Sequence, residues 1–279
     1  MVGMKSIRVL GLILILIGTA AAQTPGTFGT PQSIGSIFDT QLATAAAQAS
    51  TVTIAHFPYG GGYGTRVVLS NSSGTGPVTV DVAFFDPSNG QPTSVPLEGK
   101  GSQSTEHFVI APNAIQVINA DPSQRNVGST KVAWATASAN GPLTVFSAFD
   151  FFSPTTTFAV GAPSTVAAKT FRFPVSANGP LKYNAGLAVA NPNNGVTTVT
   201  VKLLNGNGTV KGSVVKTLQA FAQTIFLLNQ SDIFGSQLGS AAFDGSVAIC
   251  ADKPVGLVAL GAEKGALFST AITNDACPQ

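Results

Sequence analysis

Alternation of apolar and polar residues is the strongest pattern in this chain, and it predicts β-strands. Between Val78 and Phe84, every second residue is a large apolar one, and Thr79 and Asp81 lie between them. Residues 198–203 repeat the pattern, with Val and Leu alternating with Thr and Lys. Successive side chains of a strand point to opposite faces of the sheet, so this period of two indicates strands that bury one face.

The succession of strands and turns is present twice. Residues 186–204 have the pattern of a strand, a polar turn after Asn191 and a second strand, and a weaker copy surrounds Asn71 at an offset of 191 − 71 = 120 residues. The pair Phe173-Pro174 matches Phe57-Pro58, and residues 218–226 match 110–118. About seven or eight short strands per copy, with frequent turn signals, predict an all-β fold of two tandem antiparallel β-sandwich domains. Their expected bounds are 51–162 and 163–279.

Turn residues predict how neighbouring strands connect. Asn140-Gly141 lies between expected strands at 130–137 and 143–152, and this dipeptide favours a β-hairpin. The glycine-rich residues 60–64 predict a flexible loop. Residues 231–238 predict one short helix, with Ser231 placed to cap it. The second copy is expected to contain further strands at 170–174, 245–250, 256–260 and 267–272.

The N-terminus has the parts of a secretory signal peptide, predicted at residues 1–22. Lys5 and Arg8 precede an apolar core at 9–17, and Ala20-Ala-Ala22 supplies small residues for cleavage. The core is shorter than the roughly 20 residues that a spanning helix needs. We therefore expect no membrane insertion after cleavage and a secreted protein, extracellular or periplasmic, in which residues 23–50 form a leader or spacer.

Charge makes nucleic acid an unlikely partner class. Charged residues form only 9% of the chain, against a usual share of about 25%. Loss of Lys5 and Arg8 with the signal peptide lowers Lys+Arg from 14 to 12, which equals the 12 Asp+Glu. A neutral protein lacks the basic face on which nucleic-acid binding depends.

Two cysteines, Cys250 and Cys277, remain after the signal peptide. In an oxidising compartment an even count favours a disulfide, which would attach the C-terminal tail to a strand of the second domain. The alternative is one buried and one exposed thiol. No His lies near either cysteine, so the pair does not predict a metal site.

The sequence predicts no catalytic residues, cofactor or metal. His56 and His107 are the only histidines, and neither lies near a recognisable nucleophile. The three glutamates and nine aspartates mostly occupy turns, which does not favour a glycosidase pair. The glycines at 60–64 precede a strand, so they lack the helix N-terminus of a phosphate loop.

Aromatic residues are the best candidates for ligand contact. Tyr59 and Tyr63 flank the glycine loop and could be exposed, as rings that stack on sugars must be. Trp134 lies within a strand and is expected in the core. For Phe146, Phe149, Phe151 and Phe152, three roles stay open: an interdomain contact, which we favour, core packing and ligand stacking.

Several stretches resemble a largely uncharacterised group of secreted bacterial β-sandwich repeats, frequent in acidobacteria and similar soil bacteria. The resemblance rests on residues 171–175, 186–192, 245–249 and 253–260 and covers about 51–272. The first copy keeps His56-Phe57-Pro58 but has Ser72 after Asn71, where the group usually has Pro. The resemblance implies tandem immunoglobulin-like sandwiches and carries no catalytic residues.

These observations together predict a non-enzymatic, secreted structural or adhesive protein at the cell surface or in the extracellular matrix. Its partner would be a surface or matrix protein or polysaccharide, including a second copy of itself. The alternative is a carbohydrate-binding module that uses Tyr59 and Tyr63.

Overall fold

A computed structural model of the chain describes residues 51–73, 76–153, 157–164, 166–176, 184–238, 243–263, 266–269, 272 and 276–278. The predicted signal peptide (1–22) and leader (23–50) lie outside the described residues. Residues 45–279 belong to one compact unit. The described part is an all-β structure of antiparallel sheets, as the sequence predicted.

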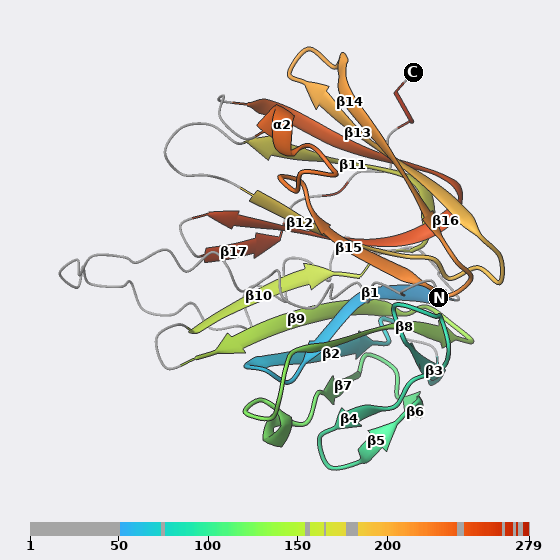
Figure 1. Cartoon of the computed structure of the whole chain (residues 1–279). Helices are drawn as coiled ribbons and strands as arrows, with labels where there is room; N and C mark the ends of the chain where they lie inside the picture. The colour runs from blue at the N-terminus through green and yellow to red at the C-terminus, as the bar shows by residue number, and fades with distance from the viewer. Residues whose placement is uncertain are drawn as a thin grey trace, which may run out of the picture. The chain divides into compact units, whose positions relative to one another are not determined.

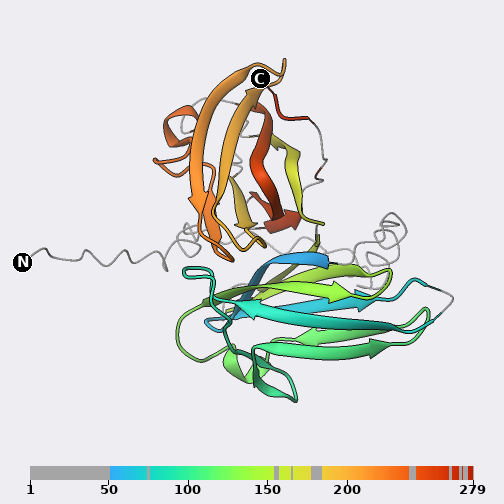
Figure 2. The ribbon, with the colours of Figure 1, turned by 90° about the vertical axis from the view of Figure 1, so that its right-hand side faces the viewer.

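Two four-stranded sheets form the first half of the described chain (Figures 1 and 2). Sheet 1 has the order β1-β8-β3-β6 and sheet 2 the order β10-β9-β2-β7. A two-stranded ribbon, β4-β5, and the 3-10 turn η2 complete this half. The bounds are β1 (Thr51–Tyr59), β2 (Tyr63–Ser70), β3 (Val78–Phe85), β4 (Val95–Leu97), β5 (Gly101–Gln103), β6 (Thr105–Ile110), β7 (Ile115–Asn119), η2 (Pro122–Gln124), β8 (Lys131–Ala139), β9 (Thr144–Phe152) and β10 (Thr157–Pro163).

The second half repeats this strand order. Sheet 3 runs β11-β16-β13-β14 and sheet 4 runs β17-β16-β12-β15, so the long strand β16 belongs to both (Figure 1). Replacing β1, β8, β3 and β6 by β11, β16, β13 and β14 converts sheet 1 into sheet 3. The bounds are β11 (Ala168–Ser176), β12 (Asn184–Ala190), β13 (Thr197–Asn205), β14 (Val210–Leu218), β15 (Gln223–Leu227), α2 (Gly235–Leu238), β16 (Asp244–Glu263) and β17 (Ala266–Ser269).

Each half has its own apolar core between its two sheets. In the first half, strand β3 alternates as predicted, with Val78, Val80, Val82 and Phe84 buried in the core. The other sheet contributes residues such as Leu69 to the same cluster. The second core is built in the same way, around Phe171, Phe173, Leu187, Val201 and Leu203.

Asn71 and Asn191, which defined the 120-residue offset, make matching hydrogen bonds. Both are fully buried. The Asn71 side-chain amide donates to the carbonyls of Gly76, Ile110 and Ala111, at 2.9, 3.0 and 3.2 Å. The Asn191 amide donates to the carbonyls of Gly195, Leu218 and Gln219, at 2.9, 3.4 and 2.8 Å. Each asparagine thus ties the end of one sheet to the edge strand of the other.

The predicted hairpin at Asn140-Gly141 is wrong. The strands on either side, β8 and β9, belong to different sheets and do not pair. Asn140 instead binds β3: its Oδ1 accepts from Thr79 N at 2.8 Å, and its own N–H donates to Thr79 O at 3.2 Å. The turn is held against a third strand, so the chain crosses between the sheets there. In the second half β16 makes the same crossing without a break, through Pro254.

Two further expectations differ from the structure. No strand was predicted at 210–218, where β14 lies, because its residues are mostly exposed or half-buried and lack a clean apolar alternation. The expected helix at 231–238 is reduced to the single turn α2, preceded by the turn residues 231–234. Strands β8 and β9 follow one another along the chain but lie in different sheets, whereas the last two strands of the first half, β9 and β10, share sheet 2.

Candidate functional site

The expected exposure of Tyr59 and Tyr63 is contradicted by the structure. Their side chains are buried, with 8% and 7% of their surface exposed. The Tyr59 ring lies edge-on to Phe57, and the Tyr63 ring lies 4.7 Å from that of Phe151. Burial raises the pKa of both phenols. Both rings are used in packing, so neither forms a platform on which a sugar could stack.

The glycines between these tyrosines form a tight turn rather than an open loop. Gly60, Gly61 and Gly62 all have positive φ values, of 71°, 55° and 95°. The Gly62 N–H donates to Arg125 O at 2.6 Å, and a Cβ on Gly61 would lie 2.4 Å from Thr130 N. Only glycine combines this backbone with so close an approach. The residue type is therefore explained by packing of the turn against residues 125–130.

An ion pair lies beside this turn. The Arg125 guanidinium donates to the Asp150 carboxylate, and both side chains are 30% exposed. The guanidinium carbon also lies 4.5 Å from the centroid of the Phe152 ring, which is 43% exposed. A Cβ on Gly64 would collide with the Asp150 carboxylate. The Arg125 guanidinium thus covers one face of the partly exposed Phe152 ring.

The two histidines lie on opposite edges of sheet 1. His56, on β1, is buried, and its Nδ1 has no hydrogen-bond partner in the described structure. Burial alone lowers the pKa of His56 from 6.5 to about 4. His107, on β6, is exposed, and its Nδ1 lies 2.7 Å from Asp81 Oδ1. Among the described residues, no three His, Cys, Asp or Glu side chains are grouped as metal ligands would be.

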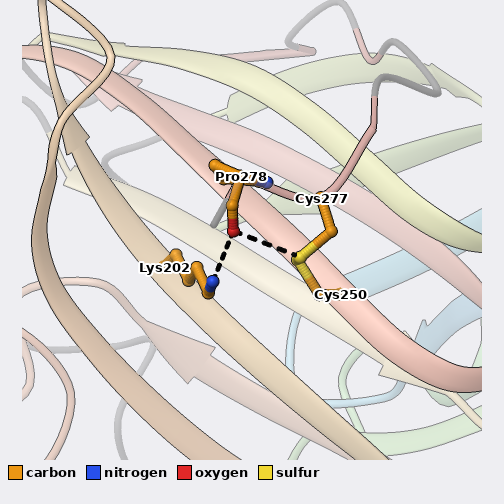
Figure 3. The surroundings of a disulfide bond; sticks show 4 residues. All are labelled: Lys202, Cys250, Cys277 and Pro278. Atoms are coloured by element: carbon orange, nitrogen blue, oxygen red, sulfur yellow. Dashed lines mark hydrogen bonds between the residues drawn. A yellow bond between two sulfur atoms is a disulfide. The ribbon is translucent and has the colours of Figure 1, made fainter.

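A disulfide joins Cys250, on β16, to Cys277, as the sequence predicted (Figure 3). The Cα atoms are 5.7 Å apart, and no described cysteine is free. The Lys202 ammonium, on β13, donates to the carbonyl of Pro278 beside the bond (Figure 3). The bond and the lysine together hold residues 276–278 against sheet 3.

A third apolar cluster contains residues of both halves, and we call it the seam. Trp134 is its largest side chain and is fully buried. The prediction of a buried Trp134 is therefore confirmed, although it packs in the seam and not in the first core. The seam consists of Ala55, Trp134, Phe149, Val160 and Ala162 from the first half and Ala188, Ala190 and Val258 from the second, with Phe85, Phe221, Ile225 and Leu260 packed against it.

Polar contacts fix the geometry of the seam. The Trp134 indole Nε1 donates to Phe221 O at 2.9 Å, and Gln223 N donates to Pro87 O at 2.9 Å. The Phe85 ring stacks on both Trp134 and Phe221, with centroids 4.7 and 5.4 Å away. A buried indole normally needs a hydrogen-bond acceptor. The second half supplies this acceptor, so the Trp134–Phe221 hydrogen bond fixes how the two halves meet at the seam.

Phe221 is a seam residue that sequence reasoning missed. Its φ is 54°, a left-handed backbone that bulky residues rarely adopt. Asn113 occupies the matching turn of the first half with a φ of 55°, and asparagine tolerates that conformation. The signal in the sequence is that position 221 is a phenylalanine, whereas the matching position in the stretch 110–118 is Asn113. Such strained positions persist when surrounding contacts hold them, and here the stack with Phe85 does so.

The four phenylalanines of β9 do not share one role. Phe149 belongs to the seam, the contact that we favoured. Phe146 and Phe151 are buried, at 4% and 8% exposure. Phe152 is the most exposed of the four and lies under Arg125.

Two edge strands carry exposed valines. Strand β6 ends sheet 1 and strand β14 ends sheet 3, and each pairs with one neighbour in the described structure. Val109 on β6 is 67% exposed and Val215 on β14 is 60% exposed. An edge strand presents free backbone N–H and C=O groups to an incoming strand.

Comparison of the chain with protein-family models, curated proteins and solved structures gives no match. Within the described residues, no helix is long and apolar enough to cross a membrane.

Proposed function

We propose that this chain is a secreted, non-enzymatic protein with a structural or adhesive role at the cell surface or in the extracellular matrix. It would consist of two tandem sandwiches, 51–162 and 163–279, of immunoglobulin-like architecture. The shared strand order of the two halves and the matching bonds of Asn71 and Asn191 support a duplication. The Cys250–Cys277 bond is compatible with an oxidising compartment.

The pair of edge strands with exposed valines is the observation that carries the adhesive role. Strands β6 and β14 can each accept a further strand through backbone hydrogen bonds, a recurrent mode of peptide recognition. Val109 and Val215 would then supply apolar contact on the outer face of the extended sheet. The seam supports this role because it packs together the two halves, each of which carries one of these edge strands. The proposed partner is an extended protein segment of a surface or matrix protein.

Fractionation of producing cells tests this function. We expect the wild-type protein in the cell or matrix fraction. The double variant Val109→Lys/Val215→Lys should move into the medium, because lysine on an edge strand opposes strand addition. The matched control is Val127→Lys, at a loop valine that is 57% exposed. Detection of the wild type only as a freely diffusing monomer would contradict the proposal, and release of the control variant would show that lysine itself causes the loss.

A further inference from the structure

His56 lies in a β-bulge of β1. The strand pairs regularly with β8 up to Ile54, and the register shifts by one residue before Phe57. Ala55 and His56 therefore stand together opposite Trp134. A bulge of this kind adds one residue and re-aims the side chains around it. The equivalent strand, β11, has a register shift between Ala168 and Thr170 but pairs regularly from residue 170 to 176, so the bulge at His56 has no counterpart at the matching positions.

The bulge places His56 at the border between the first core and the seam. Ile54 and Phe57 belong to the core, whereas Ala55 belongs to the seam. The His56 ring contacts Phe149 edge-on, with centroids 5.6 Å apart, and Phe149 is itself a seam residue. The imidazole is thus enclosed by aromatic and aliphatic groups at the contact between the halves.

Polar atoms without partners gather around this bulge. Thr53 Oγ1, His56 Nδ1 and Gln223 Oε1 are buried and make no hydrogen bond in the described structure. Gln223 is anchored there, because its Nε2 donates to Ala55 O. Thr53 packs against the second half, where a Cβ on Gly256 would lie 2.2 Å from its Cγ2. Buried polar atoms are normally paired, so this part of the seam is poorly compensated.

Among the described side chains of the surrounding strands, no charged group lies where it could compensate a charge on His56. Desolvation is the only cause of its lowered pKa. Strands β10, β12 and β15 contain no ionisable residue. The charged groups on the other neighbouring elements either bind another residue or lie beyond the bulge. Lys131 lies beyond it, opposite Tyr59. The others form these hydrogen-bonded pairs: Arg66 with Asn119, Asp150 with Arg125, Asp86 with Ser88, Asp244 with Ser176, Asp252 with Thr198 and Lys253 with Val196.

We propose that His56 makes the seam acid-sensitive: the neutral imidazole holds the two halves together, and proton binding releases them. A protonated His56 would be a buried cation with no counter-charge, so it is more stable where the seam is open to water. The contribution of the seam is fully present above the ordinary histidine pKa of 6.5 and is lost as the pH falls toward about 4. At pH 4 the open form should be favoured by a factor on the order of 10² relative to neutral pH.

Trp134 provides a direct measurement of the seam, because it is the only tryptophan in the chain. Its indole N–H donates to Phe221 O across the seam. We expect its fluorescence emission to move to longer wavelength, and its quenching by acrylamide to increase, between pH 6.5 and pH 4. Far-UV circular dichroism should remain constant over the same range, because the two cores stay closed.

Histidine variants decide whether His56 is the sensor. His56→Gln should shift the Trp134 transition to lower pH by at least one pH unit, and His56→Phe should do the same if the glutamine variant does not fold. His107→Gln is the matched control and should leave the transition in place, because His107 is exposed. A wild-type Trp134 signal that stays unchanged down to pH 4 would overturn the proposal. So would a transition that both folded His56 variants share with the wild type.

Discussion

Replacing Asn71 or Asn191 by alanine tests whether each residue ties together the two sheets of its own half in the same way. Each side-chain amide satisfies three backbone carbonyls while fully buried. A typical intramolecular hydrogen bond contributes about 0.5–1.5 kcal/mol net, and a buried acceptor left without a donor costs about 1–3 kcal/mol. The amide has two hydrogens for these three acceptors, so one hydrogen is shared, and their loss should lower the free energy of unfolding by about 2–4 kcal/mol for Asn71→Ala.

The two substitutions should not be equal. Asn71 Oδ1 accepts from Ser73 N, whereas Asn191 Oδ1 accepts from Asn193 N and from the fully buried Thr197 hydroxyl at 2.9 Å. The additional bond to a buried hydroxyl should make Asn191→Ala more costly by about 1 kcal/mol.

Urea unfolding at pH 7, followed by circular dichroism, measures both differences. Asn207→Ala is the matched control, because Asn207 only caps an exposed turn at Thr209, and it should change the free energy of unfolding by less than about 1 kcal/mol. The reasoning is refuted if Asn71→Ala and Asn191→Ala unfold at the same urea concentration as the wild type. It is also refuted if Asn207→Ala loses as much as they do.

Three further predictions concern the seam, the disulfide and the glycine turn. Phe221→Asn should move the Trp134 emission to longer wavelength at pH 7, because the ring that stacks on Phe85 is lost, and an unchanged spectrum would show that this stack does not order the seam. Cys277→Ser opens a 27-residue loop and should lower the free energy of unfolding by about 3.5 kcal/mol. In a urea titration, this variant should unfold at the same urea concentration as the wild type with reductant. Gly61→Ala should lower the free energy of unfolding by about 2–3 kcal/mol. The control Gly99→Ala, which also has a positive φ but has open space where a Cβ would lie, should lower it by only about 1 kcal/mol. Equal thermal unfolding midpoints of the two variants would contradict the close approach of Gly61 to residue 130.

His56 and the carboxylates are expected to respond to acid over different pH ranges. Burial opposes the shift, but hydrogen bonds from Ser88 and Asn89 leave the pKa of Asp86 lowered, and the Lys216 hydrogen bond lowers that of Asp232. A carboxylate with a lowered pKa contributes stability above its unfolded pKa, which is lost as the pH falls through the folded value. Because the ordinary aspartate pKa is about 3.9, these losses begin at about pH 5 and grow below it. A Trp134 change that starts between pH 6.5 and about pH 5 is therefore the part of the response that His56 is expected to cause.

The sequence alone determined the local elements and their repetition. The period-two pattern from Val78 to Phe84 predicted a half-buried strand, because that period is a property of the strand itself. The offset between Asn71 and Asn191 predicted corresponding units, and the two residues make corresponding bonds. An even cysteine count and a predicted signal peptide together favoured the disulfide that the structure contains.

Only the tertiary structure decided how these elements meet. The Asn140 turn has ideal hairpin chemistry, yet its bonds to β3 send β9 into the opposite sheet. Tyr59 and Tyr63 have the composition of an exposed binding loop, but neighbouring phenylalanines bury them. The bulge at His56 and the strained backbone of Phe221 both lie at the contact between the halves. Such contacts join residues far apart in the chain, so no local pattern of side chains encodes them.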